Sequence, residues 1–124
     1  MKIGELSRLT GVSIRSLRYY EQKGLLSPAR LINGYREYHP FAVEQVNTIS
    51  FYLQLGLSTD EIGSFLHCVM KNKEAFCQEI LPVYKKKLEE IDNQMKLLTM
   101  LRSNLEERIE AIRAENPDLF EKSE

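Results

Sequence analysis

Apolar positions divide the sequence into several short helical stretches at the front and one long helical stretch at the back. At the front, apolar residues at helical spacing precede Gly11, which predicts a helix over residues 3–10. These apolar residues are Ile3, Leu6 and Leu9. Ser13 then stands where an N-cap belongs, and a second helix is predicted over residues 14–22 before Gly24 ends it. Two short helices joined by a tight turn with a glycine are typical of a helix-turn-helix.

A hairpin is predicted directly after these two helices. Asn33-Gly34 is a strong hairpin signal because a type I′ turn requires a positive φ at both central residues. The flanking stretches 30–32 and 35–38 would form its two strands. The sequence therefore predicts a small wing beside the helix-turn-helix.

Two further helices are predicted before a polar break at residues 71–73. Pro40 suits the first turn of a third helix that runs to Gly56, and Ser58 with Glu61 forms a capping box for a fourth. The residues expected to face inward are Phe41, Val46, Ile49 and Leu53 on the third helix and Ile62, Phe65, Leu66 and Val69 on the fourth.

The back of the chain has the pattern of a coiled coil. Ten positions step by alternating threes and fours, and nine of them are apolar or aromatic. They are Leu81, Tyr84, Leu88, Ile91, Met95, Leu98, Arg102, Leu105, Ile109 and Ile112. A helix of roughly 30 residues is about 45 Å long, so its stripe needs a partner helix, most simply a second copy. Pro82 marks either the start of this helix or a kink in it, and Asn116-Pro117 ends it.

Composition is that of a folded, water-soluble protein, with 43% hydrophobic and 28% charged residues in 124. We expect a mainly all-α fold: a winged helix-turn-helix over residues 1–72, a dimerisation helix over 73–115 and a tail over 116–124. No apolar run reaches the length of a membrane span, and the start lacks a signal-peptide core. The expected location is the cytoplasm.

Charge is distributed unevenly along the chain. Residues 1–40 carry seven Lys and Arg against three Glu, a net charge of +4, whereas residues 41–124 carry ten basic and fifteen acidic residues, a net charge of −5. A basic front half on a chain of net charge −1 indicates a basic working surface.

The second predicted helix concentrates basic and phenolic side chains. Arg15, Arg18 and Tyr19 lie at i, i+3 and i+4 and therefore share one face, roughly opposite Leu17 and Tyr20. Guanidinium groups bind phosphates or guanine edges, and the second helix of a helix-turn-helix enters the major groove. The wing repeats this chemistry with Arg30, Tyr35, Arg36 and Tyr38. The alternative is a solvated basic surface whose tyrosines lie half in the core.

Three segments carry a family resemblance. They are "IGELSRLTGVSIRSLRYYEQKGLL", "NGYREY" and "LGLSTDEI", which follow one another in this order. Together they resemble the MerR family of bacterial transcription regulators over roughly residues 2–70. The most specific parts are the R-Y-Y-E run that starts at Arg18, the residues Gly24-Leu25-Leu26, and the run from Asn33 to Arg36.

The resemblance implies a winged helix-turn-helix homodimer joined by an antiparallel coiled coil. Such dimers bind a palindrome in promoter DNA and, on binding an effector, distort it so that RNA polymerase engages both promoter elements. Carried over by position, Arg18, Tyr19, Arg36 and Tyr38 would contact DNA, mainly its phosphates. Arg15 and Ser16 are candidates for reading bases.

The part of the chain where metal-sensing relatives bind their effector has fewer candidate ligands here. Metal-sensing relatives carry cysteines at the start of the dimerisation helix and in a loop beyond it; Cys77 lies near the first place, but no cysteine follows it. A metal site is therefore not expected, and no cofactor is expected either. Cys68 is most simply a small core residue, with a sensory thiol at Cys68 or Cys77 as the alternative.

Four aromatic residues would line a possible effector pocket between the front domain and the partner's helix, although packing in a core or an interface is their more ordinary role. They are Tyr52, Phe65, Phe76 and Tyr84.

The alternatives to a DNA-binding regulator are a protein-interaction module and an enzyme. A coiled-coil protein that binds another protein through its front domain would show little of the salt dependence that DNA binding shows. An enzyme is not expected, because the sequence has no nucleophile–base set, no phosphate loop and two isolated histidines, His39 and His67.

Overall fold

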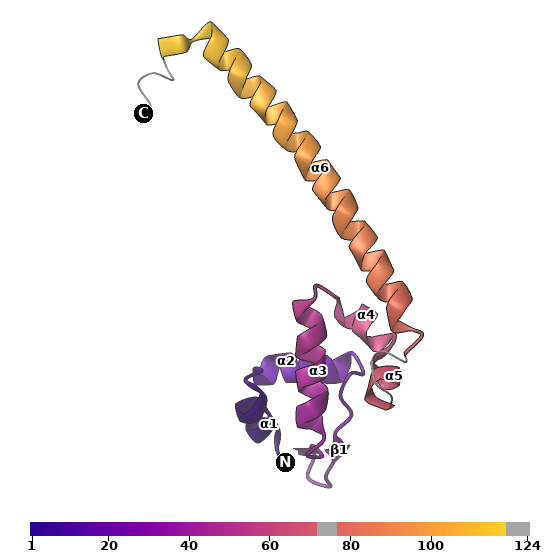
Figure 1. Cartoon of the computed structure of the whole chain (residues 1–124). Coiled ribbons are helices and arrows are strands. Elements are labelled where there is room, and N and C mark those ends of the chain that lie inside the picture. The colour runs from indigo at the N-terminus through magenta and orange to yellow at the C-terminus, as the bar shows by residue number, and fades with distance from the viewer. Residues whose placement is uncertain (72–76, 119–124) are drawn as a thin grey trace. The chain divides into compact units, whose positions relative to one another are not determined.

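The computed structural model describes residues 1–71 and 77–118 of the chain. It divides into two compact units, Met1–Tyr84 and Lys85–Glu124, and Figure 1 shows their helices and hairpin. Lys71, the first residue of the polar break predicted at residues 71–73, ends a helix. The rest of that break, the domain boundary predicted there, Phe76 and most of the predicted tail lie outside the described residues. In the described part of the chain, no helix is both long and apolar enough to cross a bilayer.

The helix-turn-helix forms as the sequence predicts. Helix α1 spans Ile3–Thr10 and helix α2 spans Ile14–Gln22. Gly11 ends α1 with a φ of 74°, a left-handed conformation that suits glycine at a helix C-terminus. The Ser13 hydroxyl caps α2 by accepting a hydrogen bond from the Ser16 amide at 3.1 Å.

A two-stranded hairpin follows α2. Strand β1 (Ala29–Arg30) pairs antiparallel with β2 (Arg36–Glu37), with Ala29 opposite Glu37. The strands are shorter than predicted. In Figure 1 the hairpin lies at the lower end of this unit, beside the N-terminus.

The turn of the hairpin differs from the predicted type I′ turn. The Gly34 amide donates to the Leu31 carbonyl at 2.9 Å, and the Leu31 amide donates to the Tyr35 carbonyl at 2.9 Å. Gly34 has a φ of 84°, whereas Asn33 has no positive φ. The loop therefore has three residues and ends in a left-handed glycine. Asn33 contributes through its side chain, whose Oδ1 accepts the Tyr35 amide at 3.1 Å.

Helix α3 spans Ala42–Gln54 and supplies much of the core. Val46 and Ile49 are buried and Leu53 is partly buried, as predicted. Phe41 is a correction, because it lies at the N-cap position and is exposed rather than inward-facing.

The predicted fourth helix is divided into two. Helix α4 (Thr59–Gly63) begins with the predicted capping box, and helix α5 spans Leu66–Lys71. The Ser64 hydroxyl donates to the Glu61 carbonyl at 2.6 Å, and the Phe65 amide bonds the Ile62 carbonyl three residues back at 3.2 Å. These hydrogen bonds reach three residues back instead of four, so they interrupt the α-helical hydrogen bonding between α4 and α5.

One hydrophobic core holds the first unit together. Its buried residues are Leu6, Leu17, Tyr20, Leu25, Leu26, Tyr38, Ala42, Val46, Ile49, Tyr52, Leu57, Ile62, Phe65, Leu66, Cys77 and Ile80. The rings of Tyr52 and Phe65 meet edge to face, with centroids 4.9 Å apart. Every helix from α1 to the start of α6 thus contributes to a shared interior.

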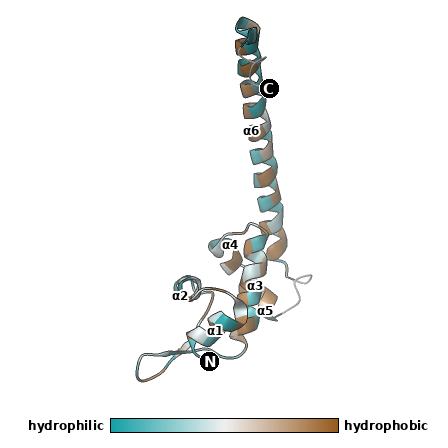
Figure 2. Ribbon diagram, turned by 90° about the vertical axis from the view of Figure 1, so that its left-hand side faces the viewer, coloured by the Kyte–Doolittle hydropathy of each residue, from teal (hydrophilic) through white to brown (hydrophobic). Residues whose placement is uncertain are grey.

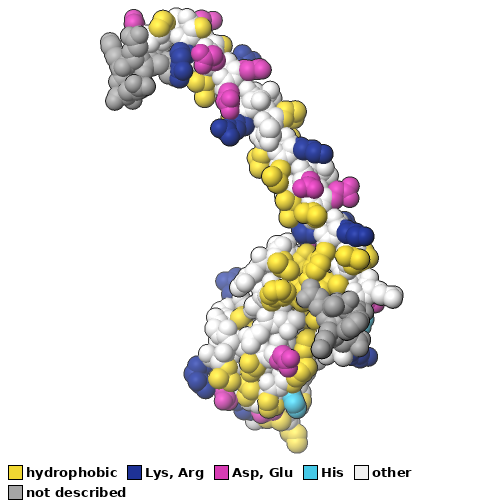
Figure 3. All heavy atoms as spheres, viewed as in Figure 1, with side chains coloured by type: hydrophobic (Ala, Val, Ile, Leu, Met, Phe, Trp, Pro, Cys, Tyr) yellow, Lys and Arg dark blue, Asp and Glu magenta, His cyan; other side chains and the backbone are white. Residues whose placement is uncertain are grey.

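The last helix, α6, spans Ile80–Glu115. Pro82 lies in its first turn, where the missing amide proton would have no intrahelical partner, so this proline marks the start of the helix. From Lys85 to Asp118 no described residue is buried. Hydrophobic and hydrophilic residues alternate along this part of α6 (Figure 2), and many apolar side chains are at the surface (Figure 3).

The two cysteines form a disulfide bond, which corrects the expectation of separate thiols. Cys68 on α5 is bonded to Cys77, and their Cα atoms are 5.8 Å apart. Cys77 is the more buried of the two, whereas Cys68 is only partly buried at the edge of the core.

Candidate nucleic-acid interface

The outer face of α2 presents unpaired cations. Arg15, Arg18 and Tyr19 are exposed, while Leu17 and Tyr20 on the opposite face are buried, as the helical spacing predicts. Neither Arg15 nor Arg18 forms an ion pair with any residue in the described part of the chain. Two exposed guanidinium groups a turn apart are therefore free to bind an external anion.

Lys23, just beyond α2, is positioned by neighbours. Its Nζ lies 3.2 Å from Asp60 Oδ1 and 5.8 Å from the centre of the Tyr19 ring. The hydrogen bond that Lys23 donates to Asp60, and then the charge of Asp60, raise the pKa of Lys23 above its ordinary value. Lys23 thus contacts the ring of Tyr19 and links the end of α2 to α4.

Glu21 joins the helix to the wing, a role that the sequence pattern did not reveal. Its Oε1 accepts from Arg30 at 3.1 Å, and its Oε2 accepts from Nε of Arg36. The Glu21 side chain is only 17% exposed, so these pairs are partly shielded from water. The sequence does contain a signal for this role. Glu21 is a single acidic residue within a basic segment, and an arginine lies on each side of the turn that follows it.

A groove lies between α1, α2 and the wing. Its volume is about 740 Å³, and it is lined by Lys2, Ile3, Arg18, Asn33, Gly34, Tyr35 and Arg36. Three of these residues are cationic and none is acidic. The Lys2 ammonium lies 5.4 Å from the centre of the Tyr35 ring, which keeps a phenol at the rim. Lys2 also lies 3.4 Å from Glu37, and Arg36 is paired with Glu21, so Arg18 is the lining cation without an ion pair among the described residues. The groove offers the guanidinium of Arg18 and the remaining donors of Lys2 and Arg36 to a polyanion.

Tyr38 is placed differently from the sequence expectation of an outward DNA contact. Its side chain is 2% exposed, and its hydroxyl has no hydrogen-bond partner among the described residues. The Tyr38 amide donates to the Met1 carbonyl at 2.7 Å, which holds this residue against the chain start with its ring inward. Burial, followed by the charge of Glu21, raises the pKa of the Tyr38 phenol.

Ser16, the candidate base reader, is partly buried and already engaged in the helix cap. Its hydroxyl oxygen accepts a hydrogen bond from the Ser13 hydroxyl at 3.0 Å. The hydroxyl proton of Ser16 remains the group that a base or phosphate would accept.

The four aromatic residues proposed for an effector pocket are largely packing residues. Tyr52 and Phe65 are fully buried, and the Tyr84 ring lies 6.5 Å from that of Tyr52. Phe76 is outside the described residues. Tyr52 and Phe65 therefore fill the core, and Tyr84, which belongs to α6, is partly buried against it.

Comparison with known protein families agrees with this arrangement. The model of the MerR family regulatory proteins matches residues 2–38, and the model described as "MerR, DNA binding" matches residues 43–114. Together the two models cover the helix-turn-helix, the wing and most of α6. The chain belongs to the MerR family. It is therefore a DNA-binding transcription regulator, in a family of regulators rather than of enzymes.

Individual MerR regulators are similar over most of the chain. The transcriptional regulator HmrR of Rhizobium leguminosarum bv. viciae is 34% identical over 111 residues, which cover 90% of this chain and 85% of HmrR. The mercuric resistance operon regulatory protein of Bacillus cereus is 32% identical over 124 residues, which cover 97% of this chain and 90% of that protein.

A solved structure shows the same fold. PbrR691 of Ralstonia metallidurans CH34, in complex with lead(II), superimposes with a TM-score of 0.74 at 27% identity, covering 85% of this chain and 81% of PbrR691. A MerR protein of similar length therefore shares both the winged unit and the long helix.

Proposed function

We propose that this MerR protein is a homodimer that binds a palindromic promoter site through two copies of the α2 face and groove described above. The observation that carries this proposal is the pair of unpaired guanidinium groups, Arg15 and Arg18, beside a groove lined by cations and no acid. In this proposal Arg18, Arg36 and Lys2 hold phosphates, Tyr19 on the exposed face of α2 donates to a phosphate, and Arg15 with Ser16 reads bases.

Arg36 has a divided role in this scheme. Its Nε is occupied by Glu21, which leaves its terminal nitrogens for a phosphate. The ion pair orients the guanidinium before DNA arrives, so less side-chain entropy is lost on binding. Tyr38 supports this arrangement from the core, beneath the wing, rather than by direct contact.

The dimer is supported by the apolar stripe of α6. Eight stripe residues are exposed in the single chain: Leu81, Leu88, Ile91, Met95, Leu98, Leu105, Ile109 and Ile112. A helix with such a stripe is stabilised when a second helix packs its own apolar side chains between these residues.

We infer that regulation follows the pattern of the family. The dimer would hold promoter DNA and, with an effector bound, bend or untwist it so that RNA polymerase engages both promoter elements. The comparison with the EcmrR–DNA complex in EcmrR-RPo supports a DNA-bound form of this fold: that protein is 28% identical with a TM-score of 0.63, covering 86% of this chain and 38% of EcmrR.

Selection from a randomised duplex library tests the proposal directly. The full chain is incubated with the library, the retained duplexes are sequenced, and the affinity for the recovered site is measured at several salt concentrations. Three phosphate-binding cations on each of two protomers predict a slope of log K against log salt of about −5. Recovery of a palindrome with this slope supports the proposal.

The same experiment distinguishes DNA binding from the alternative function, a protein–protein interaction module. Such a module would either retain no duplex from the library or bind the retained duplexes with an affinity that hardly depends on salt. Either result would contradict sequence-specific DNA binding through this face.

A further inference from the structure

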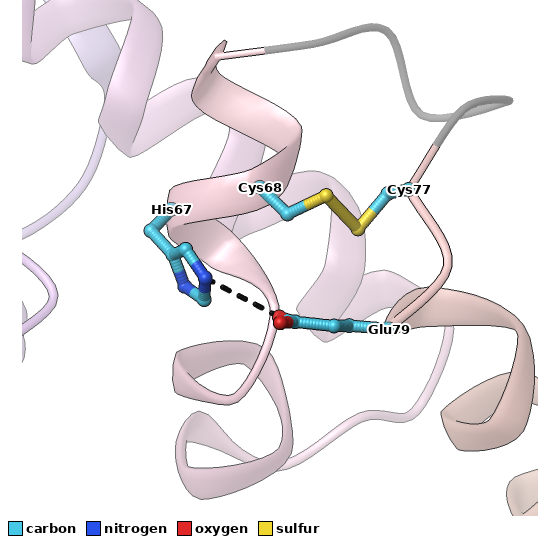
Figure 4. The surroundings of a disulfide bond; sticks show 4 residues. All are labelled: His67, Cys68, Cys77 and Glu79. Carbon is cyan, nitrogen blue, oxygen red and sulfur yellow. Dashed lines mark ion pairs between the residues drawn. A yellow bond between two sulfur atoms is a disulfide. The ribbon is translucent and has the colours of Figure 1, made fainter.

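The Cys68–Cys77 disulfide joins two elements that meet at the base of α6. Cys68 belongs to α5, and Cys77 precedes α6 by a few residues (Figure 4). A separation of nine residues and a Cα distance of 5.8 Å make the bond a short covalent bridge between them. This bridge has no part in the DNA-binding face.

A second contact links the same two elements. His67 precedes Cys68 on α5, and its Nε2 lies 3.3 Å from Oε2 of Glu79, next to the start of α6 (Figure 4). Ile80, in the first turn of α6, is buried in the core, and Tyr84 packs on Tyr52. Among the described residues, the disulfide, the contact between His67 and Glu79 and the packing of Ile80 and Tyr84 therefore help to hold the base of α6.

We propose that Cys68 and Cys77 are a reversible redox couple, and that their disulfide fastens the base of α6 to α5 so that thiol–disulfide exchange sets the affinity of the dimer for DNA. The link to DNA rests on the function proposed above. Disulfides in the compartments where transcription regulators work are usually transient, because small thiols there keep cysteines reduced. A structural role alone would not persist under those conditions.

The exchange proceeds in two balanced steps with a small thiol as reductant. Its thiolate bonds the sulfur of Cys68, the more exposed partner, the S–S bond breaks, and Cys77 leaves as a thiolate that takes up a proton. A second small thiolate then attacks the sulfur of the reductant in this mixed disulfide. It releases Cys68 as a thiol and forms the disulfide of the reductant. A small disulfide drives the reverse reaction.

The consequence for DNA follows from the position of the bridge. Residues 1–84 carry the DNA-binding face, and the exposed stripe begins in α6 and continues through Ile112. Both halves of a palindrome are bound only when both winged units are held relative to the dimer helices. Opening the bridge loosens the base of α6, and DNA binding must then pay for ordering it. We expect the oxidised protein to bind DNA more tightly.

The first test needs no DNA. Amide hydrogen exchange over Tyr84–Leu88, the first residues of α6 whose amides bond carbonyls within the helix, is compared between the oxidised full chain, the chain reduced with dithiothreitol, and the double variant Cys68→Ala/Cys77→Ala. Alanine is chosen because Cys77 is buried and a serine hydroxyl there would need a partner. Exchange should be about tenfold faster in the reduced chain and in the double variant, with α1 and α2 unchanged.

Glu79→Gln is the matched control. It weakens the contact with His67 but keeps the disulfide, so it should respond to dithiothreitol as the original chain does. Oxidised glutathione should restore slow exchange in the reduced chain and leave the double variant unaltered. Maleimide labelling followed by mass measurement should modify neither cysteine before reduction and both after it.

The second test uses the duplex recovered from the selection. Affinity should fall about fivefold or more on reduction, and the double variant should match the reduced chain under both conditions. Free thiols in the oxidised preparation, or amide exchange over Tyr84–Leu88 that is unchanged by dithiothreitol, would overturn the redox couple. If exchange responds but affinity does not, the control of DNA binding is wrong. If no duplex is recovered at all, the proposed function fails while the exchange result still stands.

Discussion

The winged unit and the later part of α6 contain apolar residues at the same helical spacing, but these residues reach opposite environments. Leu6 in α1 is 0% exposed, whereas Leu98 in α6 is 64% exposed. The winged unit folds several short elements around one core, while residues 85–115 have only their own helix. The contrast shows that one part of the chain completes its interior alone and the other leaves its apolar stripe for a partner.

The two regions also differ in how their charges are used. In the winged unit, Glu21 pairs with Arg30 and Arg36, which are distant in sequence, and Arg15 and Arg18 have no ion pair with a described residue. On α6 the ion pairs are local, such as Arg102 with Glu106 one turn away at 3.0 Å. Long-range pairs shape a binding face, whereas local pairs support an exposed helix.

Disrupting the apolar stripe of α6 should have the largest effect, which is a loss of dimer stability. Leu98→Asp removes an apolar side chain from each protomer and places two charges in the seam, which should weaken the dimer by at least about 4 kcal/mol. Sedimentation equilibrium should show monomers. The control Asn93→Asp adds the same charge away from the stripe and should remain dimeric; an unchanged dimer for Leu98→Asp would contradict the role of the seam.

Removing an unpaired cation from α2 should have the next largest effect. Arg18→Ala should weaken binding of the recovered duplex by about 1–3 kcal/mol per half-site, and reduce the magnitude of the salt slope by about 2 in the dimer. Fluorescence anisotropy over a salt series measures both quantities, while sedimentation should show an intact dimer.

Arg8→Ala is the matched control for this charge loss. Arg8 is exposed on α1, lies 3.8 Å from Glu5 and does not line the groove. Its affinity for the duplex should stay close to that of the original chain. Equal losses for both variants would show that net charge, rather than the α2 face, accounts for binding.

Weakening the ion pairs between α2 and the wing should have a smaller effect, on the free energy of unfolding. Glu21→Gln weakens two charged hydrogen bonds to Arg30 and Arg36 and should lower the free energy of unfolding by about 1–3 kcal/mol. Thermal denaturation should show a lower Tm. Glu5→Gln, which weakens only an exposed pair with Arg8, should change Tm little; a similar loss in both variants would exclude the bridging role of Glu21.

The smallest expected effect is a pH dependence at Glu37. Hydrogen bonds from the Met1 amino group and then from Lys2 lower the pKa of this carboxyl below its ordinary value of 4.5. The unfolded chain therefore takes up the proton first, and the contribution of Glu37 to stability is present above about pH 4.5 and disappears as the pH falls through the lowered pKa. Urea unfolding of Glu37→Gln should be slightly easier than that of the original chain at pH 7 and equal to it in strong acid. A difference that persists in acid would assign the effect to something other than this charge.

The positions of the short helices could be predicted from local sequence. The residues that begin and end these helices act on backbone groups only a few positions away, so their effects can be predicted from neighbouring residues in the sequence. They are Gly11, Ser13 and the Ser58–Glu61 pair. The hairpin was predicted for the same reason, but its turn type was wrong because Gly34 alone supplies the left-handed conformation. The division between α4 and α5 was also missed, since it depends on hydrogen bonds that compete with the helical ladder.

By itself, the sequence determined the helix-turn-helix, the wing, the basic front half and the stripe of α6, because spacing, capping and charge are local properties. Only the tertiary structure decided that Tyr38 points inward, that Glu21 binds two wing arginines and that Cys68 meets Cys77. Each of these outcomes depends on groups brought together from separate elements. Packing a shared core fixes such distances, and the order of residues along the chain does not encode them in any short-range pattern.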